Sequence, residues 1–168
     1  MGYFWFNSAV EKIKNIKLPP LPKLEDTATK WQKFEYNKNS LNFSFEYPSE
    51  MDILQVQEEV PQSPVQVSLS PKQTDDYNTL WTIVTDQTGS CKKIGVSDEV
   101  LGDIEIGGTT TQKIKSSITG YDGRIYTNIS VCLKNNGIIY TLTCNHQKSE
   151  NYDYSNFYKM ISTFKLIK

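Results

Sequence analysis

The chain has few of the residues that most often carry chemistry. Its 168 residues include one histidine, His146, one arginine, Arg124, and three cysteines. No C-x-x-C or H-x-x-x-H spacing occurs, so no pattern typical of a zinc site is present. Gly107-Gly108 is not a phosphate loop, because it lacks the glycine spacing and the lysine of that motif. We therefore predict no metal, no cofactor and no catalytic residue.

The chain also has no excess of charge of either sign. The formal net charge is -1, and the 18 basic side chains are spread along the chain. Nucleic-acid binding draws most of its affinity from a clustered basic surface. With Arg124 as the only arginine, bidentate contacts to phosphate or guanine have almost no donor. The sequence therefore predicts no nucleic-acid partner.

Long hydrophobic runs are absent, since no stretch approaches the ~18 apolar residues of a membrane-spanning helix. The chain nevertheless opens with four consecutive aromatic residues, Tyr3-Phe4-Trp5-Phe6. Aromatic side chains gather where a spanning helix leaves the bilayer. One interpretation is that a membrane or signal segment upstream of Tyr3 was trimmed. The other is a natural start whose aromatic residues dock on the domain.

The sequence predicts that the chain has three parts. Residues 1–17 hold the aromatic segment and a short amphipathic helix, Ser8–Lys17, with capping-box spacing at its start. Residues 18–30 form a Pro-rich linker, because three closely spaced prolines end the helix and keep the backbone extended. The globular domain then spans residues 31–168.

Alternating apolar and polar residues predict a succession of strands in this domain. Leu41–Pro48 has this period of two and stops at a Pro-Ser corner, which is typical of a half-buried strand entering a turn. Leu80–Val84 is apolar on both sides, which predicts a central strand covered from both faces. No strand-helix-strand crossover pattern occurs, so we expect a mainly antiparallel sheet.

A hairpin and a closing helix are predicted most sharply. Asn136-Gly137 accepts the positive φ angles of a two-residue turn. That turn places six apolar residues on one side, in the pairs Leu133–Tyr140, Val131–Leu142 and Ile129–Cys144. At the end of the chain, an apolar stripe at helical spacing predicts a buried helix face made of Phe157, Met160, Ile161 and Phe164.

The same hairpin register constrains the cysteines. Cys144 falls on the apolar side and Cys132 on the opposite side, so these two should not bond to each other. Any disulfide must use Cys91, which lies in a loop that can reach either face. We take Cys91 and Cys144 as the candidate pair. An envelope setting would favour a disulfide, whereas a cytosolic one would leave three buried thiols.

The single histidine gives a weak case for catalysis. We interpret His146 as a solvated loop residue that follows the hairpin strand. Cys144 shares its side of the strand, but no signature supplies an orienting acid. A small hydrolase or redox enzyme that uses Cys144 or His146 is therefore the alternative hypothesis.

Three stretches resemble a group of small bacterial cell-envelope proteins with a PsbP-like fold. They are the opening FSF-x-YPS at Phe43–Ser49, the I-x-I-G-G at Ile104–Gly108, and the ending around Ser162-Thr163-Phe164-Lys165. The resemblance implies an α+β fold, an α/β/α sandwich with a central, mainly antiparallel sheet and helices on both faces. Proteins of this fold share no catalytic residues that could be carried over. Unlike the lipoproteins of the group, this chain has no cysteine near its N-terminus for lipid attachment.

The resemblance implies a setting as well. Our first hypothesis is a non-catalytic extracytoplasmic binding or scaffolding module, membrane-anchored in a bacterial cell envelope through its N-terminus. Its partner would be another envelope protein or a cell-wall component. Loops at the sheet ends, such as Asp86–Lys93 and Tyr121–Gly123, are the expected recognition surface, since loops vary without disturbing a core.

Overall fold

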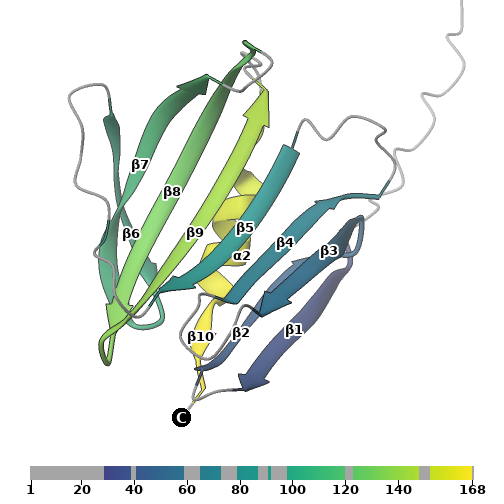
Figure 1. Ribbon diagram of the computed structural model, residues 1–168, viewed down its shortest axis with the longest axis vertical. Coiled ribbons are helices and arrows are strands. Elements are labelled where there is room, and N and C mark those ends of the chain that lie inside the picture. The colour runs from purple at the N-terminus through teal and green to yellow at the C-terminus, as the bar shows by residue number, and fades with distance from the viewer. Residues whose placement is uncertain are drawn as a thin grey trace, which may run out of the picture.

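The computed structural model describes residues 29–38, 41–58, 65–72, 79–86, 91, 98–119, 123–147 and 152–167. The expected helix Ser8–Lys17 and almost all of the Pro-rich segment lie outside these residues. Within them, the strands form two antiparallel sheets (Figure 1). A three-stranded sheet has the order β1-β2-β10, and a seven-stranded sheet has the order β3-β4-β5-β9-β8-β7-β6.

The elements follow one another as a series of strands with one helix near the end of the chain. Their bounds are β1 Trp31–Lys38, β2 Leu41–Pro48, β3 Met51–Glu58, β4 Val65–Pro71, β5 Thr79–Asp86, β6 Glu99–Ile106, β7 Thr109–Thr119, β8 Ile125–Asn135, β9 Ile138–Gln147, α2 Ser155–Thr163 and β10 Lys165–Leu166. The predicted strand Leu41–Pro48 is confirmed as β2, and a turn follows it directly.

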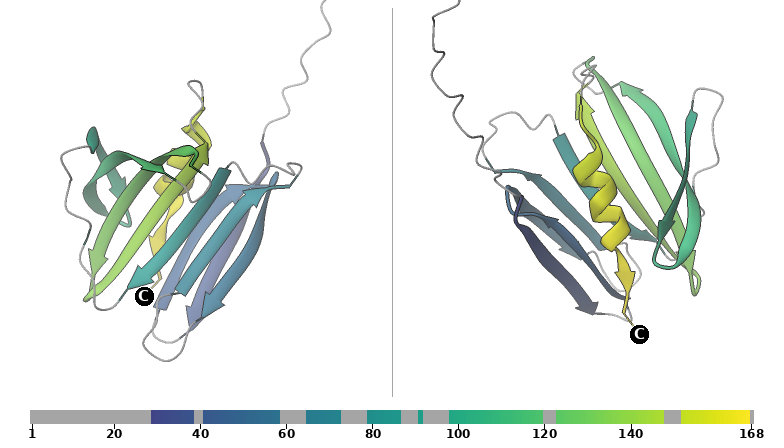
Figure 2. Two further views of the ribbon diagram at one scale, coloured as in Figure 1. Left: turned by 45° about the horizontal axis from the view of Figure 1, so that its top comes forward. Right: turned by 180° about the vertical axis from the view of Figure 1, so that it is seen from behind.

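The core lies between the seven-stranded sheet, α2 and the three-stranded sheet (Figure 2). Apolar residues of the sheet face α2, which contributes the fully buried Phe157, Met160 and Ile161. Phe164 stacks on Phe43 of β2, with ring centroids 5.7 Å apart, and it meets Tyr140 of β9 at the same distance. Phe164 thus connects the three-stranded sheet and the seven-stranded sheet at the end of α2. Large aromatic side chains contribute much of the surface area that a core buries.

The hairpin prediction is confirmed in full. Asn136 and Gly137 have φ angles of 49° and 81°, which are the left-handed values that a two-residue turn requires. Leu133 lies opposite Tyr140, and the two other predicted pairs are present. Gly107-Gly108 likewise forms the turn between β6 and β7, with positive φ at both residues.

The closing helix is shorter than its apolar stripe. All four stripe residues are buried, as predicted, but α2 ends at Thr163. Phe164 is already extended, with φ of -62° and ψ of 128°, and it leads into β10. Helical spacing therefore identified buried side chains correctly across a helix-to-strand junction.

The predicted α/β/α sandwich with helices on both faces is wrong. In the part of the chain that the structure describes, α2 is the only helix, and it lies on one face of the seven-stranded sheet (Figure 1). The fold is mainly β, with two antiparallel sheets. The physical reason is the polarity of the other face at the central strands, where residues such as Ser68, Thr82 and Thr143 offer a second helix little apolar surface to cover.

The strand Leu80–Val84 shows the same error locally. Trp81 and Ile83 are buried on the side of α2, whereas Leu80 and Val84 on the other side are only half-buried. β5 does lie inside the sheet, as predicted, but on the side away from α2 only Thr82 is buried, so that side is less completely covered. α2, the helix of the described residues, is not long and apolar enough to cross a membrane.

Candidate functional site

The two residues of the alternative enzyme hypothesis lie inside the core. Cys144 and His146 both project from β9 toward α2, and they are 0% and 2% exposed. The interpretation of His146 as a solvated loop residue is therefore wrong. β9 extends to Gln147 because its register with β8 continues as far as the pair of Tyr126 and Gln147.

His146 is held by two hydrogen bonds and one ring stack. Its Nδ1 donates to the Gln147 carbonyl at 2.6 Å, so Nε2 accepts from the Tyr154 hydroxyl. The imidazole also stacks on Tyr152, with centroids 4.3 Å apart and planes inclined by 12°. Both ring nitrogens therefore have hydrogen-bond partners within the protein. These contacts hold residues 152–154, which precede α2, against β9.

Cys144 is equally enclosed. Burial raises the pKa of its thiol to about 12, and the nearby Tyr152 hydroxyl and Trp81 indole offset only part of that effect. The indole N–H lies beside the sulfur but completes no hydrogen bond of good geometry. Because the thiolate is the nucleophilic form, this cysteine is inert near neutral pH.

The tyrosines around this cluster are not acid–base groups at neutral pH either. Burial raises the pKa values of Tyr152 and Tyr154 to about 12, and the nearby Cys144 thiol adds to both shifts. These phenols stay protonated and serve as hydrogen-bond donors. Sequence reasoning missed both residues, although the spacing of aromatic residues just before Phe157 could have indicated that this segment is buried.

The disulfide differs from the candidate pair. Cys91 bonds to Cys132, with a Cα–Cα distance of 5.7 Å, and Cys144 is free and buried. Cys132 and Cys144 lie on opposite faces of the hairpin, as the register predicted. Cys91 therefore pairs with the outward-facing thiol, because Trp81, Tyr152 and α2 already fill the space around Cys144.

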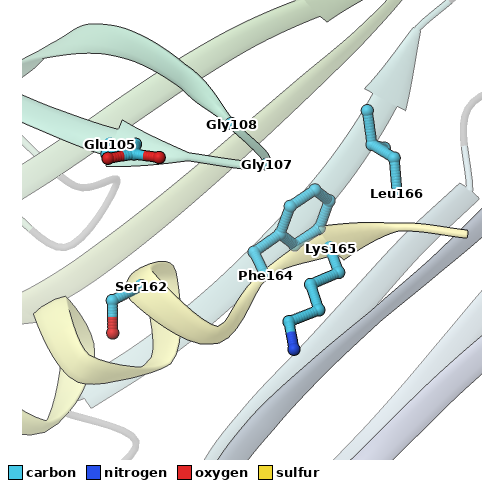
Figure 3. Close-up of a pocket in the computed structure, with 7 residues that line it drawn as sticks. All are labelled: Glu105, Gly107, Gly108, Ser162, Phe164, Lys165 and Leu166. Carbon is cyan, nitrogen blue, oxygen red and sulfur yellow. The ribbon is translucent and has the colours of Figure 1, made fainter.

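The cleft in Figure 3 lies between the β6–β7 turn and the junction of α2 and β10. Its volume is about 520 Å³, and its lining consists of Glu105, Gly107, Gly108, Ser162, Phe164, Lys165 and Leu166. Glu105 lies on β6, across the cleft from Phe164 and Lys165 at the junction of α2 and β10. A Cβ at Gly107 would come within 3.3 Å of Leu133, so this glycine allows the turn to approach the core.

A second cleft of about 850 Å³ lies between β1 and β3. Lys38 crosses it to Glu58, with an Nζ–Oε1 distance of 2.9 Å. This ion pair and the Tyr36 hydroxyl lower the pKa of the Glu58 carboxyl. Cys144 and His146 line neither cleft.

Two further features are a possible metal site and the predicted recognition loops. The residues described by the structure hold no group of three or more histidine, cysteine, aspartate or glutamate side chains that could bind a metal ion. Of the two predicted recognition loops, only Asp86, Cys91 and Gly123 belong to the described residues. The remainder of both loops lies outside them.

No family model matches the chain, and no curated protein is significantly similar to it in sequence. A crystal structure from Bacteroides thetaiotaomicron matches with a TM-score of 0.55 and 14% identity, over 82% of this chain and 48% of the other. The chain thus spans about half the length of that protein.

Two further solved structures are similar. The cyanobacterial PsbP (CyanoP) from Synechocystis has a TM-score of 0.50 and 11% identity, over 89% of this chain and 100% of the other. LpqN of Mycobacterium tuberculosis, described as involved in cell envelope biogenesis, has a TM-score of 0.45 and 14% identity, over 82% and 92% of the two chains. The PsbP-like resemblance of the motifs is therefore confirmed at the level of the fold.

Proposed function

We propose that the protein is a non-catalytic binding or scaffolding module that works outside the cytoplasm, in the cell envelope. The observation that carries this proposal is the disulfide between Cys91 and Cys132, which joins residues 41 positions apart. Disulfides form and persist in oxidising compartments and are rare in reducing ones. The bond links a loop residue to the outward face of β8, so it serves to hold the surface in one arrangement.

The positions of Cys144 and His146 support a non-catalytic role. A nucleophile or general base must come within hydrogen-bond reach of its substrate. Both side chains are enclosed by Tyr152, Tyr154 and α2, and both clefts are lined by other residues. The alternative, a small hydrolase or redox enzyme, would need a rearrangement that opens this part of the core.

The proposal includes a membrane tether that precedes Tyr3. Its support is the run of aromatic residues Tyr3–Phe6, since such residues favour the bilayer interface. The prolines that follow would hold the domain away from the membrane surface as a semi-rigid spacer. Neither segment belongs to the described residues.

Fractionation of cells that express the full-length gene tests this function. Membrane, extracytoplasmic and cytosolic fractions are treated with an alkylating reagent under denaturing conditions, before and after reduction. We expect the protein in the envelope fraction, with one thiol alkylated before reduction and three after it. A cytosolic protein with three reduced thiols would overturn the proposal. The double variant Cys91→Ser/Cys132→Ser is the control for the thiol count.

A further inference from the structure

β1 is an edge strand with a regular and unpaired edge. It pairs with β2 on one side, and no strand of the described residues pairs with its other side. Figure 1 and Figure 2 show it at the margin of the molecule. β1 keeps one register along its whole length, whereas the registers of β3 and β6, the edge strands of the seven-stranded sheet, are each interrupted. Such interruptions discourage edge-to-edge pairing, and β1 lacks this protection.

The register shows which backbone groups of β1 point away from β2. In an antiparallel pair, alternate residues exchange hydrogen bonds with the partner strand, and the residues between them direct their N–H and C=O groups outward. The Ser49 N–H donates to the Lys30 carbonyl at 2.7 Å. Pro48, which has no N–H to donate, lies opposite Trp31. The even-numbered residues of β1 therefore bond to β2, and the outward groups belong to Trp31, Lys33, Glu35 and Asn37.

The far edge of β2 shows how such outward groups are satisfied elsewhere in the same sheet. The Glu46 N–H donates to Thr163 Oγ1 at 2.8 Å. The Asn42 carbonyl accepts from the Ile167 N–H at 2.9 Å. On β1 the equivalent groups have no such partner among the described residues. An unpaired row of backbone donors and acceptors is a template for another β-strand.

The side chains of Lys33 and Glu35 give this edge a self-complementary charge pattern. Both are more than half exposed on the same side of β1, where they form an ion pair with each other. In a two-fold symmetric antiparallel pair of β1 strands, Lys33 of one copy can face Glu35 of the other. Symmetry then repeats the contact, so two Lys–Glu pairs form across the interface. Opposite charges that face each other across strands stabilise the pairing, and like charges destabilise it.

The same register brings the two copies of Phe34 opposite each other. Phe34 is half-buried, packs on Phe45 with ring centroids 5.1 Å apart, and lines the cleft between β1 and β3. Val56 lines the same cleft. It lies opposite the fully buried Val67 on the core side of the seven-stranded sheet, yet it is 40% exposed. A second β1 strand would place an aromatic ring beside apolar surface that the chain leaves uncovered.

We propose that two copies of this chain form a dimer through β1, with the two free edges paired antiparallel about a two-fold axis at Phe34. Lys33 of each copy exchanges backbone hydrogen bonds with Glu35 of the other, because both residues direct their N–H and C=O groups outward. The two three-stranded sheets become one continuous sheet. A contact between two strand edges is at the small end of protein interfaces, so the dimer forms reversibly and depends on concentration.

A second copy fits this edge better than an unrelated strand does. Any extended peptide can bond to the outward backbone groups, but only one with an acid and a base at matching positions also pairs with Lys33 and Glu35. The chain itself supplies that strand. The inference concerns how the chain assembles, so it holds whichever compartment the protein occupies.

Sedimentation of the full chain over a range of concentrations tests the dimer. We expect reversible association up to about 1 mM, a concentration at which half of the chains are paired if the dissociation constant is about 1 mM. Hydrogen exchange followed by NMR locates the contact. The backbone amides of Lys33 and Glu35 should exchange slowly at high concentration and fast at low concentration.

Charge variants test the register. Lys33→Glu and Glu35→Lys each place like charges across the interface and should raise the dissociation constant about tenfold or more. The double variant Lys33→Glu/Glu35→Lys restores opposite charges, and so does an equimolar mixture of the two single variants, so both should associate as the wild type does. Glu99→Lys is the matched control, because it breaks a similarly exposed ion pair with Lys115 on β7 and should leave the dimer unchanged.

Four results would overturn the proposal. The first is a chain that stays monomeric up to about 1 mM, and the second is a dimer in which the amides of Lys33 and Glu35 exchange fast. The third is a mixture of the single variants that associates no better than either alone. The fourth is slow exchange of the same amides in the monomer, which would show that another segment of the same chain covers the edge.

Discussion

The imidazole of His146 and the ring of Tyr152 stack with centroids 4.3 Å apart, and the Tyr154 hydroxyl donates to the same imidazole. These contacts join the end of β9 to the residues that precede α2. They use the only histidine of the chain as a structural connection between sheet and helix.

Tyr154→Phe tests this connection. The substitution removes the donor to His146 Nε2 and leaves a buried acceptor unpaired, so we expect a loss of about 1–3 kcal/mol in the free energy of unfolding. Urea unfolding followed by circular dichroism measures it. Tyr158→Phe, which removes a hydroxyl from the same aromatic group, is the matched control and should cost less than about 0.5 kcal/mol. Equal effects of both variants would contradict the assigned hydrogen bond.

Phe164 joins the two sheets at the end of α2. Phe164→Ala removes its contacts with Phe43 and Tyr140 and should destabilise the domain by about 3–5 kcal/mol, the usual range for a core aromatic. The shift of the urea midpoint at constant m-value gives this number. Ile167→Ala, three residues further on at an exposed position, should change stability by no more than about 0.5 kcal/mol. A loss below about 1 kcal/mol for Phe164→Ala would show that the junction is peripheral.

The Cys91–Cys132 disulfide should stabilise the domain chiefly by restricting the unfolded chain. For a bond between residues 41 positions apart, the double variant Cys91→Ser/Cys132→Ser should lose about 2–4 kcal/mol. Reduction of the wild-type protein should have the same effect, and it should leave the double variant unchanged. If reduction destabilises the variant as well, the bond has been assigned to the wrong cysteines.

Alkaline pH should destabilise the protein through the half-buried Tyr152 and Tyr154. The pKa values of Tyr152 and Tyr154 are raised from 10.0 to about 12 by burial. Above pH 10 the unfolded chain releases these protons while the folded protein retains them, so stability is complete below pH 10 and falls between pH 10 and 12. Thermal midpoints across this range measure the fall. It should be shallower in Tyr152→Phe, and an unchanged slope in that variant would exclude Tyr152 as a source.

Local chemistry was sufficient to predict the hairpin from the sequence. Asn136-Gly137 adopts positive φ by its own conformational preference, and a two-residue turn leaves one register that keeps Leu133 and Tyr140 on the same side. The burial of Phe164 was equally readable, because apolar spacing reports on which side of the chain is covered. The same spacing did not report where the helix stops, since Phe164 packs on Phe43 in an extended conformation.

Long-range packing decided the remaining features. The sequence placed Cys91 within reach of either face of the hairpin, and only the filled space around Cys144 directs it to Cys132. From the sequence alone, His146 is interpreted as a solvated residue. In the structure Tyr152 and Tyr154, which follow the end of β9, pack over its ring. The number of helices on the sheet depends on the polarity of the whole face that points away from α2, and that face forms only when the distant strands β5 and β9 pair. Turns and faces are set by neighbouring residues, whereas what covers a face is set by contacts that no local pattern contains.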